Sequence, residues 1–278
     1  MGIKFTKMQA LGNDFVVIDA ISQVVEIGRD QAHRIADRRW GVGCDQILLV
    51  ENPSRDDVDF QFRIINADGG EVAQCGNGAR CFALFVREAG LTDKTEIRVK
   101  TAADVLILNV LADDQVRVNM AVPRFEPEEI PFIATKRQDV YDLALEDGEI
   151  EISALSLGNP HAVRVVKDVD LAPVAAQGPM IERHQRFPKR VNAGFMQVCG
   201  RNHIRLRVFE RGVGETPACG SGACAAVVAG RRRALLDESV IVDLPGGRLR
   251  VEWSGNAQPV YMTGPAQSVF DGELKLTL

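Results

Sequence analysis

One pattern of ten residues occurs twice in this chain and constrains its fold more than any other feature. Residues 70–79 read GEVAQCGNGA, and residues 214–223 read GETPACGSGA. Each copy places a cysteine between a Gly-Glu pair and a Gly-x-Gly-Ala segment, and an Ala-rich apolar run follows. Cys75 and Cys219 are 144 residues apart, about half of the 278-residue chain. This spacing indicates two copies of one ancestral domain.

A second pair of segments repeats at nearly the same distance. Residues 12–17 read GNDFVV and residues 158–163 read GNPHAV, a shift of 146. Apolar alternation predicts strands at 60–66 and 203–210, whose last residues, Asn66 and Glu210, each stand nine residues before a cysteine. Gln46 and Asn192 are also 146 apart, but their neighbours do not match, so this pair carries little weight.

These repeats predict a fold of the α+β class with two pseudo-symmetric lobes. Short strands dominate each half, and the apolar residues after Cys75 recur at helical spacing until Gly90. We expect each lobe to be a curved, mostly antiparallel sheet wrapped around a central helix, with the active site in the cleft between the lobes. The first lobe should span residues 1–119, the second 120–264, and residues 265–278 should return to the first.

Composition excludes several classes of function. The net charge is −5, with basic and acidic residues interspersed, so no nucleic-acid partner is expected. The N-terminus has no apolar h-region and no apolar stretch approaches 18 residues, so we expect a cytoplasmic protein without a membrane partner. Six cysteines and four histidines without Cys-x-x-Cys spacing predict free thiols and no metal site.

The two repeated cysteines suit acid–base chemistry. A cysteine at a helix start is exposed to the positive end of the helix dipole, which favours the thiolate. The amides of the following glycines can bind a carboxylate there. Inversion of a carbon that bears hydrogen needs a base on one face and an acid on the other, and two like thiols meet this need without a cofactor. His161 and Glu210 are the nearby candidates for tuning them or for contacting a substrate ammonium.

Simpler interpretations exist for other residues. Cys81, Cys199 and Cys224 lie on apolar faces or at a strand end and are expected to be buried packing residues, as is Cys44 in its loop. His161 alone could be a structural histidine, and Asn13 could serve its own turn.

The chain resembles diaminopimelate epimerases through residues 12–19, 66–81, 158–163 and 210–224. The resemblance implies a pyridoxal-independent enzyme without a cofactor, which interconverts LL- and meso-diaminopimelate on the bacterial lysine and peptidoglycan route. It also implies the two-lobed fold of proline racemase-like and phenazine-biosynthesis proteins. It implies a homodimer, although Phe270 stands where some members have a tyrosine at a dimer contact.

By the same resemblance, Cys75 and Cys219 are the acid–base pair, and Glu210 and His161 modulate the thiols beside the substrate ammonium. The carboxylate of the reacting centre would be held by Gly76, Asn77, Gly220 and Ser221. The rest of the substrate would be bound by Asn13, Gln46, Asn66, Asn159, Asn192 and Arg211, with Arg211 paired to the distal carboxylate.

Three rival hypotheses follow from the same residues. A proline or hydroxyproline epimerase would share the fold but have no need for Arg211 or for so many amide side chains. A thiol redox protein would pair Cys75 with Cys219 as a regulatory disulfide. A non-catalytic amino-acid binding protein would not need the paired cysteines.

Overall fold

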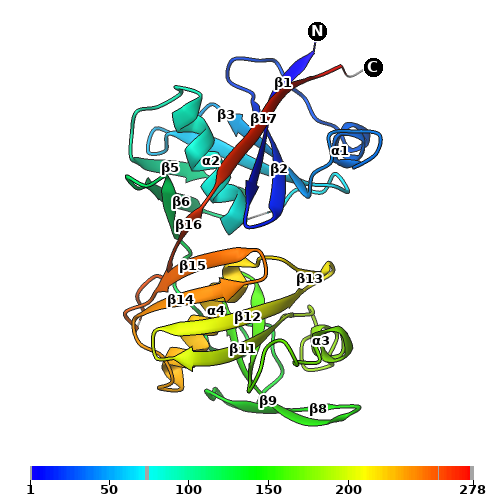
Figure 1. Cartoon of the computed structure of the whole chain (residues 1–278), viewed down its shortest axis with the longest axis vertical. Helices are drawn as coiled ribbons and strands as arrows, with labels where there is room; N and C mark the ends of the chain where they lie inside the picture. Colours follow the sequence, from blue (N-terminus) through cyan, green and yellow to red (C-terminus); the bar gives the residue numbers. More distant parts are fainter. Residues whose placement is uncertain (1, 73–74, 256, 276–278) are drawn as a thin grey trace. The chain divides into compact units, whose positions relative to one another are not determined.

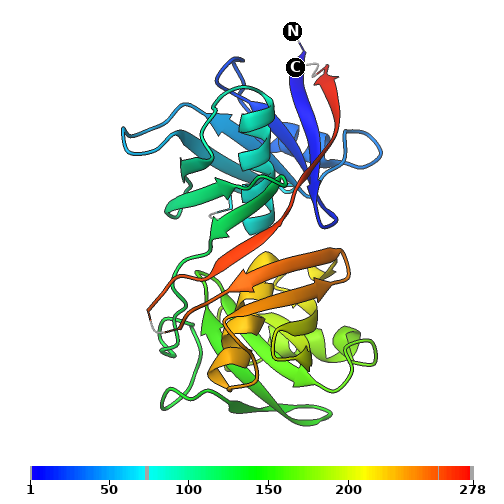
Figure 2. The ribbon, with the colours of Figure 1, turned by 60° about the vertical axis from the view of Figure 1, so that its left-hand side comes forward.

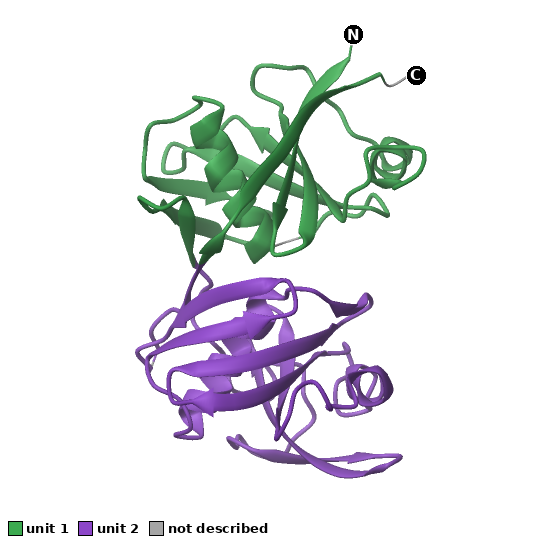
Figure 3. Ribbon diagram, in the orientation of Figure 1, with its two compact units in different colours: residues 1–118, 264–278 green, residues 119–263 purple. Residues whose placement is uncertain are grey.

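The two sequence repeats fold into two units whose strands have the same connections. The computed structural model describes residues 2–72, 75–255 and 257–275. Unit 1 comprises Met1–Val118 and Gly264–Leu278, and unit 2 comprises Asn119–Thr263 (Figure 3). The lobe boundaries expected from the sequence differ from these by one residue each.

Unit 1 is a mixed sheet in the strand order β17-β1-β2-β3-β4-β5-β6-β7. The pairs β2–β3 and β4–β5 are parallel, and the other pairs are antiparallel. The parallel pairs are connected through α1 (Arg29–Ala36) and α2 (Gly76–Glu88). The strands are β1 (Ile3–Ala10), β2 (Asn13–Asp19), β3 (Gln46–Glu51), β4 (Phe60–Asn66), β5 (Glu96–Lys100), β6 (Val105–Val110), β7 (Gln115–Asn119) and β17 (Gln267–Leu274).

Unit 2 repeats this plan in the order β8-β9-β10-β11-β12-β14-β15-β16. Its parallel pairs, β10–β11 and β12–β14, are connected through α3 (Val174–Glu182) and α4 (Gly220–Arg232). The short β13 (Gly214–Thr216) pairs with the end of β12. The strands are β8 (Tyr141–Leu145), β9 (Gly148–Ser156), β10 (Pro160–Val166), β11 (Asn192–Gly200), β12 (His203–Glu210), β14 (Ser239–Leu244), β15 (Gly247–Glu252) and β16 (Tyr261–Pro265).

The long helix of each unit lies inside its sheet. Helix α2 contacts β1, β2, β3, β6 and β17, while α4 contacts β9, β10, β11, β12 and β15 (Figures 1 and 2). A helix enclosed in this way is buried on every face, and its residues are mostly apolar, with Asn77 and Arg80 of α2 as exceptions. Residues 77–86 of α2 are accordingly all buried, as are residues 222–230 of α4. Each sheet therefore fixes the start of its long helix, where the repeated cysteine stands.

The α+β prediction, with a mostly antiparallel sheet around a central helix, is confirmed in each unit. Each unit also has a second, shorter helix; the helical spacing of Ala32, Ile35 and Ala36 predicts α1, whereas α3 was not expected from the sequence. No helix in the described ranges is long and apolar enough to span a membrane.

Candidate active site

Cys75 is the N-cap of α2, the residue just before the first helical turn. Its backbone is extended (φ −145°, ψ 109°), and its sulfur accepts a hydrogen bond from the amide of Gly78 at 3.3 Å. The first α-helical bond runs from the Ala79 amide to the Cys75 carbonyl. The thiol therefore lies among the N–H groups of a helix start, where a negative charge is favoured.

Cys219 has the same place in unit 2, at the N-cap of α4. Its backbone is again extended (φ −118°, ψ 105°), and the Ala223 amide bonds to its carbonyl. Its sulfur lies 3.7 Å from the Ser221 hydroxyl. The side chains differ in exposure, because Cys219 is 4% exposed whereas Cys75 is only partly buried.

The second glycine of each Gly-x-Gly segment lies close to its neighbours, and more closely at Gly222 than at Gly78. A Cβ atom at Gly222 would lie 3.0 Å from Val208 Cγ2 and 3.2 Å from the Cys219 sulfur. At Gly78 it would lie 3.3 Å from Leu48 Cδ2 and 3.5 Å from the Cys75 Cβ. A glycine at these positions lets the first turn pack under the cysteine without displacing it.

In unit 1, the first turn of α2 is bound to the start of β2. Asn77 Nδ2 donates to Asn13 Oδ1 at 3.2 Å, and the same oxygen lies 4.0 Å from the Cys75 sulfur as an acceptor for the thiol. Asn13 Nδ2 donates to Asp45 Oδ2 at 2.7 Å. Because a carboxylate only accepts, Asp45 fixes the amide so that its oxygen faces the cysteine.

A charge cluster holds Asp45 in turn. Arg38 Nη2 donates to Asp45 at 2.9 Å, and both Arg38 terminal nitrogens donate to Asp14 at 2.8–2.9 Å. Lys7, which is 8% exposed, reaches Asp14 at 2.5 Å and the Gly43 carbonyl. Burial raises the pKa of Asp14, but bonds from Arg38 and Lys7 outweigh it and lower that pKa to about 2. The cluster is a rigid ionic support for Asn13.

In unit 2, the first turn of α4 is bound to the start of β10 by the equivalent residues. Asn159 Nδ2 donates to Ser221 Oγ at 3.2 Å, and Asn159 Oδ1 faces His161 Nε2 at 3.0 Å. Burial, and then the charge of Arg211, lowers the pKa of His161 to about 3. The ring is therefore neutral near pH 7, and its Nε2 is the donor that Asn159 Oδ1 accepts.

Glu210, at the end of β12, acts on Cys219. Burial and then the charge of Glu210 raise the pKa of Cys219 well above its ordinary value, while bonds from the Gly222 amide and the Ser221 hydroxyl oppose the rise. Thr216 of β13 donates its hydroxyl to Glu210. His161 is connected to the first turn of α4 through Asn159.

Arg211 and Asn192 lie beside Glu210. The Asn192 side chain is 4% exposed and makes two backbone bonds, from its Nδ2 to the Pro160 carbonyl at 3.1 Å and from the Arg211 amide to its Oδ1 at 2.9 Å. Arg211 itself is exposed, with Nη1 donating to the Lys189 carbonyl at 3.3 Å. Asn192 thus positions the backbone of Arg211, a role that the sequence did not suggest.

Gln46 and Asn66 form a separate pair in unit 1. They face each other at the paired ends of β3 and β4, and Gln46 Nε2 donates to Asn66 Oδ1 at 2.9 Å. Gln46 is opposite Phe15 and Asn192 is opposite His161, so these two amides occupy equivalent positions in the two sheets. The 146-residue spacing between them is therefore part of the repeat.

The remaining cysteines differ from the two at the helix starts. Cys44, Cys81 and Cys224 are buried as expected, and burial raises the pKa of Cys44 to about 12. Cys199 is exposed, so its expected burial was wrong; it is the penultimate residue of β11. Among the described residues, no group of three or more His, Cys, Asp or Glu side chains is placed to hold a metal ion.

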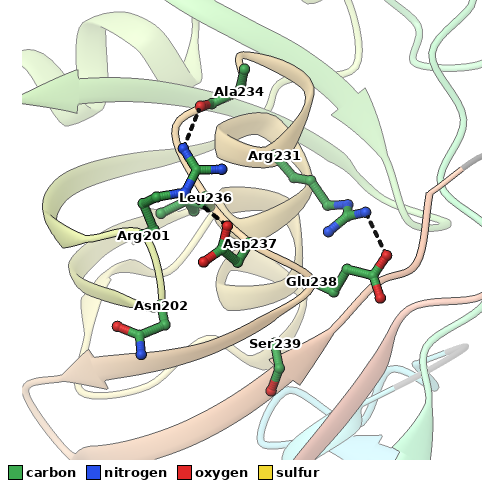
Figure 4. A pocket seen from close by; sticks show the side chains of 8 residues that line it. All are labelled: Arg201, Asn202, Arg231, Ala234, Leu236, Asp237, Glu238 and Ser239. Carbon is green, nitrogen blue, oxygen red and sulfur yellow. Dashed lines mark hydrogen bonds and ion pairs between the residues drawn. The ribbon is translucent and has the colours of Figure 1, made fainter.

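A surface groove lies at the opposite end of α4 from Cys219 (Figure 4). Its charges pair with each other, Arg201 with Asp237 and Arg231 with Glu238, both at 2.8 Å.

Sequence comparisons agree with one another. A family model described as diaminopimelate epimerase matches residues 5–126 and 153–269. A protein named diaminopimelate epimerase from Nitrosospira multiformis is 58% identical over 276 residues, covering 99% of each chain. Another of that name from Thioalkalivibrio sulfidiphilus is 59% identical over 278 residues, covering 99% of this chain and all of the relative.

Solved structures share the fold at low identity. A hydroxyproline epimerase from Agrobacterium vitis has a TM-score of 0.71 at 18% identity, covering 98% of this chain and 92% of that one. A phenazine biosynthesis protein of the PhzF family from Bacillus anthracis has a TM-score of 0.70 at 19% identity, covering 99% and 100%. The two-lobed α+β architecture is therefore shared by several groups of proteins.

Proposed function

Because this chain belongs to the diaminopimelate epimerase family, we propose that it interconverts the LL and meso isomers of diaminopimelate. It is an isomerase that acts without pyridoxal phosphate. The observation that carries the proposal is the repeated helix start, with a cysteine at the N-cap of α2 and another at the N-cap of α4. Inversion at a carbon that bears hydrogen requires a base on one face and an acid on the other, and two thiols can fill these roles.

The proton resides on Cys219 before reaction in the LL to meso direction. Burial and Glu210 raise the pKa of this thiol even though the Gly222 amide donates to it, whereas Cys75 is only partly buried and accepts the equivalent bond from the Gly78 amide, which favours its thiolate. The Cys75 thiolate removes the α-hydrogen as a proton, and the electron pair stays on the α-carbon. Cys219 then gives its proton to the opposite face, which leaves Cys75 as thiol and Cys219 as thiolate. The reverse reaction exchanges the two roles.

The substrate carboxylate at the reacting centre is bound by helix-start amides at Gly76, Asn77, Gly220 and Ser221. Helix N-termini favour an anion, and these dipoles also stabilise the charge that develops as the proton leaves. Once protonated, Cys75 donates to Asn13 Oδ1, which lies 4.0 Å from its sulfur. Arg211 binds the distal carboxylate, because its exposed guanidinium can donate two parallel bonds. Gln46, Asn66 and Asn159 supply further hydrogen bonds.

The test is isomerisation in heavy water. The reduced protein, given LL-diaminopimelate, should form the meso isomer and incorporate deuterium at the α-carbon. Cys75→Ala and Cys219→Ala should each abolish isomerisation, whereas Cys199→Ala, the same change at an exposed thiol, should leave it unchanged. Trans-4-hydroxy-L-proline serves as the control substrate and should not react. The proposal is wrong if the wild-type protein shows no isomerisation, or if both cysteine variants retain it.

We propose further that the protein is a homodimer that uses the edge of β17. This strand pairs with β1, and within the described residues its other edge has no strand partner. Val269 is 56% and Phe270 is 49% exposed there, and the Phe270 ring packs edge-on against Phe5 at 6.0 Å. An exposed apolar edge strand favours pairing with another chain. Phe270→Glu should convert a dimer to a monomer in sedimentation, and a wild-type monomer would refute the proposal.

A further inference from the structure

Glu182 is a buried carboxylate that the proposed mechanism does not use. It is the last residue of α3, and only 1% of its surface is exposed. A buried carboxylate is stable only when it is paired and hydrogen-bonded. Its partners are the Arg183 guanidinium at 3.1 Å, the Arg190 guanidinium at 3.5 Å and the Gly212 amide at 2.9 Å.

The bond to Gly212 fixes the turn that carries Arg211. Gly212 has a positive φ of 77°, and the turn closes with a bond from the Val213 amide to the Glu210 carbonyl at 3.2 Å. The Arg211 amide is held by Asn192 and the next amide by Glu182. Two successive backbone groups are thus bound by side chains, which determines the direction in which the Arg211 side chain leaves the strand.

Glu182 also holds the segment on which the Arg211 guanidinium rests. Arg211 Nη1 donates to the Lys189 carbonyl at 3.3 Å. The next residue, Arg190, has a positive φ of 58°, an unfavourable conformation for a side-chain-bearing residue that persists only where neighbours impose it. The Arg190 guanidinium pairs with the Glu182 carboxylate, and the Val191 amide bonds to the Glu182 carbonyl at 3.1 Å. Glu182 therefore holds both the turn that carries Arg211 and the segment whose carbonyl accepts from the Arg211 guanidinium.

We propose that Glu182 is a positioning residue that sets the preference of the site for a substrate with a second carboxylate, by holding Arg211. This inference rests on the proposed function, in which Arg211 binds the distal carboxylate. Without these contacts of Glu182, the guanidinium samples more orientations before binding, and the entropy cost of fixing it weakens recognition of that carboxylate. Chemistry at the α-carbon uses other residues and should change little.

The experiment compares Glu182→Ala with Glu182→Gln, whose side-chain oxygen can still accept from Gly212. Glu182→Ala should raise KM for LL-diaminopimelate about tenfold with kcat within twofold, and Glu182→Gln about threefold. The inhibition constant of L-lysine, which lacks the distal carboxylate, should not change. Glu238→Ala, in the groove of Figure 4, is the matched control and should behave as wild type. If Glu182→Ala does not fold in a thermal melt, Glu182→Gln carries the test.

A double-mutant cycle separates positioning from a general structural effect. In the Arg211→Ala background, Glu182→Gln should cause no further loss in kcat/KM, because the group it positions is gone. The inference is overturned if the loss persists in that background, if kcat falls while KM is unchanged, or if L-lysine inhibition weakens in parallel. An inactive wild-type protein would instead refute the proposed function, and this inference with it.

Discussion

An equivalent asparagine binds the first turn of α2 and of α4, but the hydrogen bond runs in opposite directions. Asn13 accepts from the turn of α2, whereas Asn159 donates to the turn of α4. In unit 1, the oxygen of Asn13 faces the helix turn because the carboxylate of Asp45 accepts from its nitrogen. In unit 2, the nitrogen of Asn159 faces the turn because neutral His161 donates to its oxygen. The asparagine is thus the same in both copies of the repeat, whereas the residue that orients its amide differs: Asp45 in unit 1 and His161 in unit 2.

This difference coincides with the proposed difference between the two thiols. Unit 1 offers Cys75 an acceptor at Asn13, suited to a sulfur that gains a proton during the forward reaction. Unit 2 surrounds Cys219 with burial and with Glu210, which keep a proton on the sulfur. Two like residues can acquire unlike protonation states from their surroundings alone. Substitutions that remove one element of that contrast at a time should affect the two helix starts differently.

The largest effect should come from the glycines under the cysteines. In Gly222→Ala, the added Cβ would lie 3.2 Å from the Cys219 sulfur, so the sulfur itself must move. In Gly78→Ala, the tightest contact is a Leu48 methyl at 3.3 Å, which can yield. Misplacement of a reacting group by about 1 Å costs about 100-fold, so a smaller shift costs less. We expect a loss of about 30-fold in kcat for Gly222→Ala and only a few-fold loss for Gly78→Ala, measured as isomerisation.

Gly200→Ala is the control, because its added Cβ would meet nothing closer than 3.8 Å. Equal losses at Gly78 and Gly222 would show that the two helix starts tolerate crowding alike, contrary to this expectation.

The next effect should come from the two anchors of the asparagines. Asp45→Ala frees the amide of Asn13, and His161→Phe, which installs the residue found at the equivalent position 15, frees that of Asn159. Each loses one oriented hydrogen bond, worth about 1–1.5 kcal/mol, which corresponds to about a tenfold loss in kcat/KM. Steady-state kinetics measure both.

Asp57→Ala, at an exposed ion pair of unit 1, is the control and should not differ from wild type. A loss for Asp45→Ala that is undiminished in the Asn13→Ala background would mean that Asp45 does not act through the amide.

The sequence predicted the elements whose pattern is local. Alternation located β4 and β12, and helical spacing located α2, because each pattern records which face its own element buries. Helix α3 was missed because Gly178 and Pro179 interrupt it. The structure explains the glycine, since a Cβ at that position would lie 2.6 Å from the Phe209 ring. A residue that weakens a helix locally here permits close packing against β12.

The sequence points to residues of the candidate site where the sequence itself repeats, but not where only the position in the sheet repeats. Gln46 and Asn192 are equivalent in register, but the flanking core residues can be exchanged as long as they stay apolar, so the local sequence does not show it. Asp45 and Glu182 were not identified because each acts on a residue that the fold brings near from elsewhere in the chain. Such contacts depend on tertiary structure, which no local pattern encodes.

A smaller effect on rate, but a clear effect on titration, should follow Glu210→Gln. The charge of Glu210 raises the pKa of Cys219, so its removal should lower that pKa. Alkylation of Cys219 by iodoacetamide should then begin at lower pH, whereas alkylation of Cys75 should keep its profile, as followed by peptide mass spectrometry. Glu215→Gln, in the neighbouring β13, is the control. An unchanged Cys219 profile would remove Glu210 from the account of the two thiols.

The smallest expected effect is on stability: acid should destabilise unit 2 at a higher pH than unit 1. Folded His161 takes up a proton only near pH 3, whereas the unfolded chain does so near 6.5. Protons therefore favour the unfolded state of unit 2 as the pH falls from 6.5 towards 3. Asp14 has a pKa of about 2 when folded and 3.8 when unfolded, so its contribution to the stability of unit 1 is lost only between those values.

Hydrogen exchange, corrected for intrinsic rates, should show β10 and β11 losing protection between pH 7 and 5 while β1 and β2 keep theirs. His161→Phe should flatten that dependence and His33→Gln, on α1, should not. A parallel loss in both units would mean that acid acts on a feature they share.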